Sequence, residues 1–318
     1  MRMTRRDFLN RTTGAAAGLV TLGAARRSLA SRPGGGPVAL RLGGPAFAPA
    51  DDPAQLARAH RQLGYRAAYC PSLSLSDSDR IRAVAEAFAR EDVVIAEVGC
   101  WCNLLDTDPA KRKQNLENVT EGLALAEAVG ALCCVDIAGS FNPTSWFGPH
   151  PDNLSPKFFD AAVENARKII DAVKPRRAKF CYEMMGWAMP HTPDNALRLL
   201  RAVDRKAFAV HLDPCNLINS PEKFYRNADL LNECFDKLGR WIVSCHAKDL
   251  TWDIEMNVHF REVRPGLGVL DYGTYLRRLA RLPHRPPLMI EHLVTAEEYA
   301  AAAAHIVAVG RQEGLTFQ

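Results

Sequence analysis

The sequence predicts one large (β/α)8 barrel domain, and two observations lead to that prediction. Between residues 38 and 315, short apolar runs alternate with helix-like stretches, eight of each. Four of the runs end in a carboxylate or a histidine, and the C-terminal ends of all barrel strands open onto one face. The alternative is an open doubly wound sheet. The turn after the first run, Leu42-Gly43-Gly44-Pro45-Ala46, lacks the glycine spacing that such a sheet uses to bind phosphate.

The elements follow from apolar periodicity and from helix-start signals. The predicted strands are Val38–Leu42, Ala67–Cys70, Val93–Gly99, Ala131–Ala138, Ala178–Glu183, Phe208–Asp213, Trp241–His246 and Leu288–Glu291. The predicted helices are Pro53–Leu63, Ser76–Arg90, Pro109–Val129, Pro156–Val173, Pro193–Val203, Pro221–Leu238, Tyr272–Leu282 and Ala296–Glu313. Several helices start with a capping residue followed by proline, as at Asp108-Pro109, Ser155-Pro156, Thr192-Pro193 and Ser220-Pro221.

The stretch from Phe208 to Asn216 shows how a strand can present a functional group. Side chains of a strand alternate in direction, so Ala209, His211 and Asp213 share one face and Asp213 is the last of them. Pro214 then ends the strand, because proline has no N–H to extend a sheet ladder. A carboxylate at such a buried position is costly unless a positive group meets it.

Three other predicted strands deliver Glu183, His246 and Glu291 at the same end of the barrel. Together with Asp213 they form a set rich in carboxylate oxygen, which suits a hard to borderline divalent cation. For any one of these residues alone, a structural role in a salt bridge or in a hydrogen bond within the core is a better explanation than a metal-ligand role. Their occurrence on four consecutive strands predicts a metal site.

The first 30 residues read as a targeting segment. Thr4-Arg5-Arg6-Asp7-Phe8-Leu9 resembles a twin-arginine export signal, residues 14–25 form a weakly apolar core, and Ser28-Leu29-Ala30 offers a cleavage site. The alternatives are an uncleaved anchor and an amphipathic arm. We expect the twin-arginine translocase to export the chain to the periplasm or the medium, with residues 31–37 as a flexible connector. No later stretch of about 20 apolar residues suggests a membrane span.

The net charge argues against a nucleic-acid partner, and the positions of the cysteines argue for buried thiols. The first 30 residues carry a net charge of +5, which leaves about −1 of the formal +4 for the rest. A near-neutral body gives no electrostatic reason to expect a nucleic-acid partner. The nine cysteines mostly lie in apolar runs and are expected to be small buried hydrophobic residues. Cys100-Trp101-Cys102 is the exception, where a soft metal or a strained disulfide is the alternative.

The ordered set of strand ends comes with three local strings: His-Leu-Asp-Pro-Cys-Asn at 211–216, His-Ala-Lys-Asp at 246–249 and Arg-Pro-Gly-Leu-Gly-Val-Leu-Asp-Tyr at 264–272. Over residues 37–315 the chain resembles the xylose isomerase-like TIM barrels. It is most similar to their sugar phosphate isomerase/epimerase group, which includes the ketose 3-epimerases.

The resemblance implies a ligand set and a reaction. The residues that would bind one divalent ion are Glu183, Asp213, His246 and Glu291. Manganese is the first expectation, with magnesium, cobalt or zinc as alternatives. Glu183 and Glu291 would move a proton next to a sugar carbonyl through a metal-stabilised enediolate.

Further residues are expected to contact a carbohydrate substrate. These are Asn216, Lys248, Glu97, Trp101, Trp187 and Arg264. The chain departs from the epimerases at Trp252, where that group usually has an arginine. Either Arg261 or Arg264, on the same long loop before the last predicted strand, takes its place, or the substrate is different.

Two other functions remain alternatives. The first is a metal-dependent lyase or dehydratase that eliminates a substituent from a keto-sugar or a 3-keto-glycoside, and the second is a non-catalytic sugar-binding barrel. Endonuclease IV belongs to the same superfamily, but the second and third predicted strands lack the extra histidines of its zinc cluster. The helix patterns leave the oligomeric state undetermined, with a homo-oligomer among the options.

Overall fold

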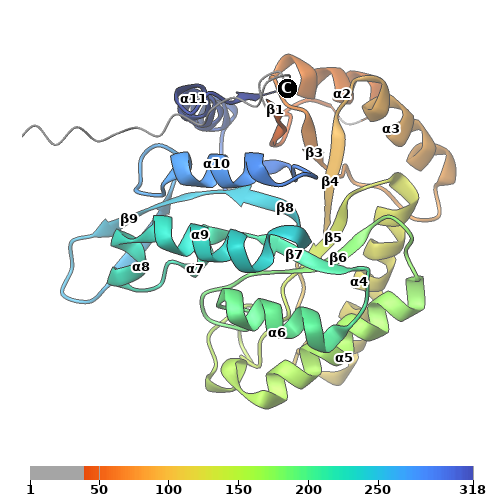
Figure 1. The fold of residues 1–318 in the computed structure, drawn as a ribbon. Helices are drawn as coiled ribbons and strands as arrows, with labels where there is room; N and C mark the ends of the chain where they lie inside the picture. The colour runs from red at the N-terminus through yellow and green to blue at the C-terminus, as the bar shows by residue number, and fades with distance from the viewer. Residues whose placement is uncertain (1–38, 50, 318) are drawn as a thin grey trace, which may run out of the picture. The chain divides into compact units, whose positions relative to one another are not determined.

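Eight parallel strands close into a barrel in the order β11-β2-β3-β4-β5-β6-β7-β8, with helices around it (Figure 1). The structure is a computed structural model that describes residues 39–49 and 51–317, which belong to one compact unit. The predicted targeting segment and connector lie outside the described residues. The predicted (β/α)8 barrel is confirmed.

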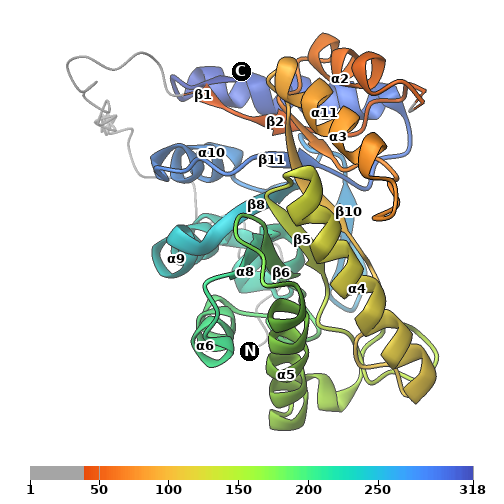
Figure 2. The same ribbon diagram turned by 90° about the vertical axis from the view of Figure 1, so that its right-hand side faces the viewer.

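The barrel strands are β2 (Leu42–Gly43), β3 (Ala67–Tyr69), β4 (Val94–Gly99), β5 (Cys133–Asp136), β6 (Lys179–Glu183), β7 (Phe208–Leu212), β8 (Ile242–Ala247) and β11 (Leu288–Ile290). The α-helices are α2 (Pro53–Gln62), α3 (Ser78–Arg90), α4 (Pro109–Val129), α5 (Pro156–Val173), α6 (Pro193–Val203), α7 (Pro214–Leu217), α8 (Pro221–Tyr225), α9 (Asn227–Leu238), α10 (Tyr272–Arg281) and α11 (Ala296–Gln312). Short 3₁₀ turns occur at η1 (Pro151–Leu154) and η2 (Gly239–Trp241). Figure 2 shows α4 and α5 on the outer side of the strands.

The cap residues named from the sequence start the helices for the expected reason. The Asp108 carboxylate accepts hydrogen bonds from the N–H groups of Ala110 and Lys111 at the start of α4. Ser155, Thr192 and Ser220 do the same for α5, α6 and α8, and each is followed by a proline in the first turn. These caps satisfy N–H groups that have no partner within the helix.

The structure adds elements that the sequence did not indicate. The first predicted strand is divided, and β1 (Ala39–Leu40) pairs outside the barrel with β12 (Thr316–Phe317) near the C-terminus. The segment between β8 and α10 contains an antiparallel hairpin of β9 (Asp249–Asp253) and β10 (His259–Val263).

The predicted helix 221–238 is divided at Arg226, whose φ of −121° and ψ of 35° are not helical. The buried Asn227 side chain explains the break, because it donates hydrogen bonds to the carbonyls of Phe224 (2.9 Å) and Val269 (3.1 Å). Those bonds tie the start of α9 to the segment before α10.

The barrel interior is layered along its axis. Cys133, Cys181 and Ala209 form an apolar layer, and His211, two residues beyond Ala209 on β7, is the next inward-facing side chain of that strand. All nine cysteines are free thiols, and six of them are buried, in agreement with the expectation of small hydrophobic residues. Within residues 39–49 and 51–317, no helix is long and apolar enough to cross a membrane.

Candidate metal centre

Four neighbouring strands bring the predicted ligands to one place. Glu183 is the last residue of β6, Asp213 follows β7 and His246 lies in β8, and the fourth residue, Glu291, follows β11. Because β6, β7, β8 and β11 are adjacent in the barrel, these four side chains converge, with one ligand atom of each within 4.8 Å of the others.

The imidazole of His246 lies at the centre of this group. Its Nδ1 atom is 2.7 Å from Oε1 of Glu291 and 2.9 Å from Oε1 of Glu183. Oδ2 of Asp213 is 3.7 Å from the same nitrogen. All four side chains are buried, and Asp213 and His246 are completely inaccessible. Several carboxylates buried this closely need a cation near them.

The orientation of Asp213 follows from its position before Pro214. Asp213 caps the short helix α7, and its Oδ1 atom accepts a hydrogen bond from the N–H of Asn216 at 3.3 Å. The other oxygen, Oδ2, is therefore directed to the centre of the group. Neither this atom nor Oε1 of Glu291 has a hydrogen-bond donor among the described residues.

Lys248 supplies the positive charge that the structure itself places beside these oxygens. Its ammonium nitrogen is 2.6 Å from Oε1 of Glu291 and 2.8 Å from Oδ2 of Asp213, as ion-pair contacts without hydrogen-bond geometry. Burial would lower the pKa of Lys248, but the surrounding carboxylates raise it overall, so the side chain stays charged. The side-chain amide of Asn216 links Lys248 to Glu183. Its Oδ1 atom accepts a hydrogen bond from Nζ of Lys248 at 3.4 Å, and its Nδ2 atom donates one to Oε1 of Glu183 at 3.3 Å.

The donor set fits a divalent cation. Oδ2 of Asp213 and Oε1 of Glu291, which contact the Lys248 ammonium but accept no well-aligned hydrogen bond, face the same point as the Nδ1 side of His246. Three carboxylates and one imidazole suit magnesium, manganese or a similar ion, because no thiolate is present among the four.

Burial and neighbouring positive charges shift the pKa values of these three carboxyl groups in opposite directions. Burial raises the pKa of Glu183, although His246 and Lys248 partly offset that rise. Burial also acts to raise the pKa of Asp213 and Glu291, but Lys248 and His246 outweigh it and lower both values.

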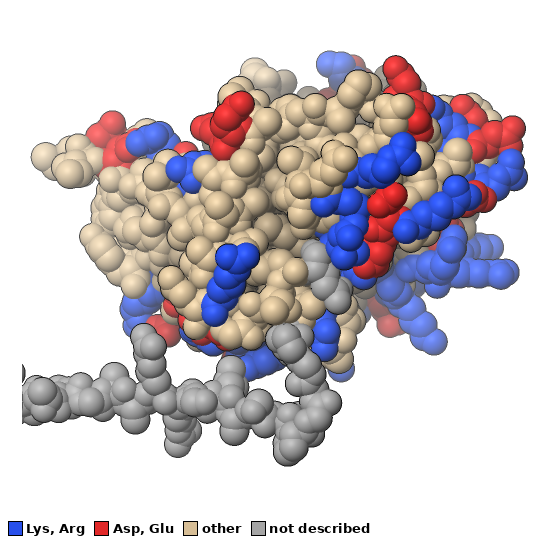
Figure 3. Space-filling model, turned by 90° about the horizontal axis from the view of Figure 1, so that it is seen from above, with Lys and Arg blue, Asp and Glu red and all other residues tan. Residues whose placement is uncertain are grey.

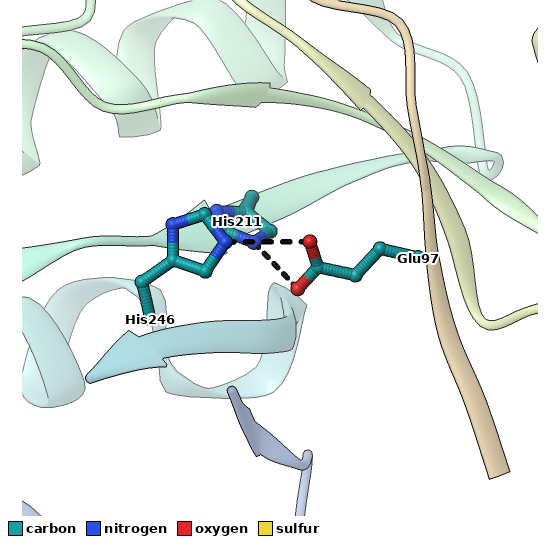
Figure 4. A group of neighbouring side chains, drawn as sticks. All are labelled: Glu97, His211 and His246. Carbon is teal, nitrogen blue, oxygen red and sulfur yellow. Dashed lines mark hydrogen bonds and ion pairs between the residues drawn. The ribbon is translucent and has the colours of Figure 1, made fainter. Parts of the chain in front are cut away.

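The other nitrogen of His246 faces a fourth carboxylate, that of Glu97, inside the barrel (Figure 4). Nε2 of His246 lies 3.3 Å from Oε2 of Glu97, and Nε2 of His211 lies 2.9 Å from Oε1 of Glu97. Ser244 donates a third hydrogen bond to Glu97, at 2.5 Å. Burial would raise the pKa of Glu97, but the two histidines lower it overall.

This geometry gives Glu97 a different place from the one expected. Glu97 was predicted as a substrate contact, but it lies on the far side of His246 from Glu183 and Glu291 and is 1% exposed. Glu97, His211 and His246 could also hold a cation by distance alone. Both oxygens of Glu97 already accept hydrogen bonds. A carboxylate behind a ligand histidine fixes the direction of its ring.

The remaining predicted substrate contacts are Trp101, Trp187 and Arg264, all among the described residues, and only Trp101 has a contact with a residue of the candidate metal centre. The Trp101 ring is 6.4 Å from the His246 ring, is 39% exposed and follows β4 with a positive φ of 44°. Trp187 is half-buried, and its ring lies 6.2 Å from that of Phe147 on the preceding loop. Arg264 donates a hydrogen bond to the Pro265 carbonyl and makes no ion pair with a described residue.

Two residues beside the centre were not predicted as site residues. Nδ1 of His292 lies 3.1 Å from Glu262 on the β10 strand, and Nε2 lies 3.6 Å from Oε2 of Glu291. His292 has a φ of 59°, in the left-handed region that few non-glycine residues adopt and that recurs at functional sites. The position of His292 directly after Glu291 is the signal that the sequence offers, whereas the hairpin that carries Glu262 has no such signal.

A parallel barrel with four convergent ligands at the strand ends defines a class of (β/α)8 proteins with a candidate metal centre. The profile of the family described as "Xylose isomerase-like TIM barrel" matches residues 57–308. The chain belongs to that family. No curated protein matches it by sequence.

Proteins of known structure with the same fold are named as enzymes of different classes. D-psicose 3-epimerase from Clostridium cellulolyticum, solved with D-tagatose, has a TM-score of 0.62 and 13% identity over 86% of this chain and 99% of its own. Endonuclease IV from Thermus thermophilus has a TM-score of 0.63 and 15% identity over 86% and 99%. The probable 3-DHS dehydratase from Bacillus anthracis has a TM-score of 0.59 and 14% identity over 81% and 93%. At 13–15% identity, these likenesses support the fold alone.

We predict that Glu97→Gln weakens divalent-metal binding by about 10- to 100-fold, because outer hydrogen-bond partners of ligand histidines have effects of that size. Calorimetric titration of the metal-free protein with Mn²⁺ measures the change. Ser244→Ala is the control, since it removes a donor to Glu97 and leaves the contact between Glu97 and His246. Unchanged affinity in a folded Glu97→Gln variant would contradict the positioning role.

Proposed function

We propose that the protein is a divalent-metal-dependent sugar isomerase or epimerase that moves a proton next to a sugar carbonyl. One observation carries the proposal. Glu183 and Glu291 come from the two ends of the arc β6-β7-β8-β11, and each has a carboxylate oxygen within 2.9 Å of Nδ1 of the central His246. Two bases on either side of one centre suit the removal of a proton from one face of a carbon and its return to the other.

The four ligand side chains would hold the ion, with manganese as the first candidate and magnesium, cobalt and zinc as alternatives. When bound, a divalent ion acts as a Lewis acid that makes the C–H bond beside a carbonyl more acidic. Glu183 or Glu291 takes the proton at a carboxylate oxygen, and the other glutamate donates one.

Lys248 and Asn216 support this chemistry from the same side of the barrel. The charged Lys248 ammonium is placed to stabilise negative charge that develops on a substrate oxygen. The Asn216 amide holds the orientation of Glu183 and offers further polar atoms to a sugar hydroxyl. Trp101 presents an aromatic face next to His246, on which a sugar ring can stack.

Elimination is the second candidate, and the pair Glu262–His292 favours it. A lyase needs a proton donor for the departing oxygen in addition to a base. The His292 ring lies beside Glu291, is hydrogen-bonded to Glu262 and is more than half exposed, so a substrate oxygen can reach it. The same base and cation would then release water or an aglycone from a keto-sugar.

The charge distribution supports a small-molecule substrate over a nucleic acid. Figure 3 shows a face on which many Lys and Arg side chains lie beside Asp and Glu side chains. Among the described residues, Arg41 and Arg66 both pair with Asp92. A nucleic-acid site would require a continuous basic surface.

Isotope exchange tests the reaction. The manganese-loaded protein is incubated with free ketoses and with 3-keto-glycosides in deuterated water, and the products are analysed by mass spectrometry. A gain of one deuterium in an otherwise intact sugar indicates an isomerase or epimerase, and loss of water or aglycone indicates a lyase. Glu183→Gln and Glu291→Gln should each lower the rate about 10²- to 10⁴-fold, the usual contribution of a positioned acid or base.

The matched control is Glu164→Gln on the outer face of α5, where Glu164 pairs with Lys168 in solvent. Full exchange in both site variants would refute the assigned bases. Metal binding without any turnover would instead support the sugar-binding barrel.

We also propose export by the twin-arginine pathway, on the basis of residues 4–9 and the apolar core that follows. Fractionation of bacterial cells that produce the full chain should find it in the periplasm. Replacement of Arg5 and Arg6 by lysine should keep it in the cytoplasm, whereas the same change at Arg26 and Arg27 should not. Transport that persists without the first arginine pair would overturn the proposal.

A further inference from the structure

Two cysteine thiols face one another on the outer side of the barrel wall. The Sγ atoms of Cys100, directly after β4, and Cys134, in the adjacent β5, are 3.5 Å apart. Side chains alternate along a strand, so Cys134 points outward toward α4, where its Sγ lies 3.9 Å from the Val119 carbonyl. Its neighbour Cys133 points inward and packs against Cys181.

Helix α4 leaves room for this sulfur pair. Its residue nearest the two thiols is Gly122, and a Cβ atom at that position would clash with Sγ of Cys100 and lie 3.3 Å from Sγ of Cys134. Glycine is unfavourable in a helix interior. At this site it accommodates the two sulfur atoms.

We propose that Cys100 and Cys134 are a redox modification site, a dithiol that closes to a disulfide when a small disulfide oxidant such as oxidised glutathione reaches Cys100. A disulfide bond is about 2.05 Å long, so the two sulfurs must approach by about 1.5 Å. Cys100 lies just beyond the end of its strand, where a side chain can move more easily than in the middle of the sheet. The two thiols are not among the four candidate metal ligands, and the proposal does not rest on the proposed reaction.

The order of events follows from exposure. Cys100 is half-buried, whereas Cys134 is completely buried. The Cys100 thiolate attacks one sulfur of oxidised glutathione, which breaks the glutathione disulfide and releases one molecule of glutathione. Cys134 then loses its proton and attacks Sγ of Cys100, which releases the second. The protein loses two protons and two electrons, and the oxidant is reduced to two thiols.

No other pair of described cysteines is shown to combine a short distance between the sulfur atoms with a thiol that an oxidant can reach. The Cys102 thiol donates toward Oδ2 of Asp136 at 3.5 Å and toward the Asn115 carbonyl at 3.7 Å. Burial and the nearby Asp136 raise the pKa of Cys102, and the contact with Cys100 and burial raise that of Cys134, so the short distance between Sγ of Cys134 and Sγ of Cys100 is what distinguishes this pair. Cys133 and Cys181 are both fully buried within the barrel, so an oxidant does not reach them.

A bridge at this place would fix one edge of the candidate site. Trp101 follows Cys100 directly, and its ring lies 6.4 Å from that of His246. The disulfide would therefore hold the segment that carries Trp101 against β5.

The test uses the purified full chain, incubated with oxidised glutathione, unfolded, alkylated at free thiols and analysed by intact mass and peptide mapping. We expect the loss of two hydrogens, a cross-linked peptide pair containing Cys100 and Cys134, and alkylation of the other seven of the nine cysteines. Cys100→Ala and Cys134→Ala should each abolish the cross-link.

Cys102→Ala is the control and should retain the bridge. Nine alkylated cysteines in the oxidised wild type, a bridge between Cys100 and Cys102, or a lasting glutathione adduct on Cys100 would each overturn the proposal. Mapping in the wild type decides the question even if a variant fails to fold.

Discussion

Three carboxylates buried together at one end of the barrel are the constraint on which the candidate site depends. Leaving one of them unpaired in such a place would cost several kcal/mol. The chain meets this cost with Lys248, whose ammonium contacts Asp213 and Glu291, and with His246 between Glu183 and Glu291. A divalent ion entering the group would compete with Lys248 for the same oxygens, so metal binding and the position of this lysine are coupled.

The barrel supplies the rigidity that this arrangement needs. Each ligand belongs to a strand or to the residue after it, and the strands are held in register by their neighbours on both sides. Asp213 combines two roles, because one oxygen caps α7 and the other faces the centre. Behind the ligands, Glu97 joins His211, Ser244 and His246 in a hydrogen-bonded group that crosses the barrel. The ring direction of His246 is thus set from within the core.

The sequence was sufficient where the signal is local. Proline after Asp213 marks a strand end, and a cap residue before proline marks the start of α4, α5, α6 and α8. It was insufficient where contacts span the chain. Glu97 and His211 are 114 residues apart, on different strands. The alternation of side chains along each strand shows which residues of that strand lie on the same face, but it does not show that these two side chains meet inside the barrel. The break before α9 depends on a bond from Asn227 to Val269, which no local pattern records. The sequence does not predict the β9–β10 hairpin, so it gives no indication that Glu262 lies beside His292.

The central claim is that Glu183, Asp213, His246 and Glu291 hold one divalent ion. Crystals grown with Mn²⁺ and measured at the manganese absorption edge test it most directly. We expect a single anomalous peak about 2.0–2.6 Å from one oxygen of each carboxylate and from Nδ1 of His246, within the range of such bonds. A peak between Glu97, His211 and the Nε2 atom of His246, or no peak in this end of the barrel, would contradict it.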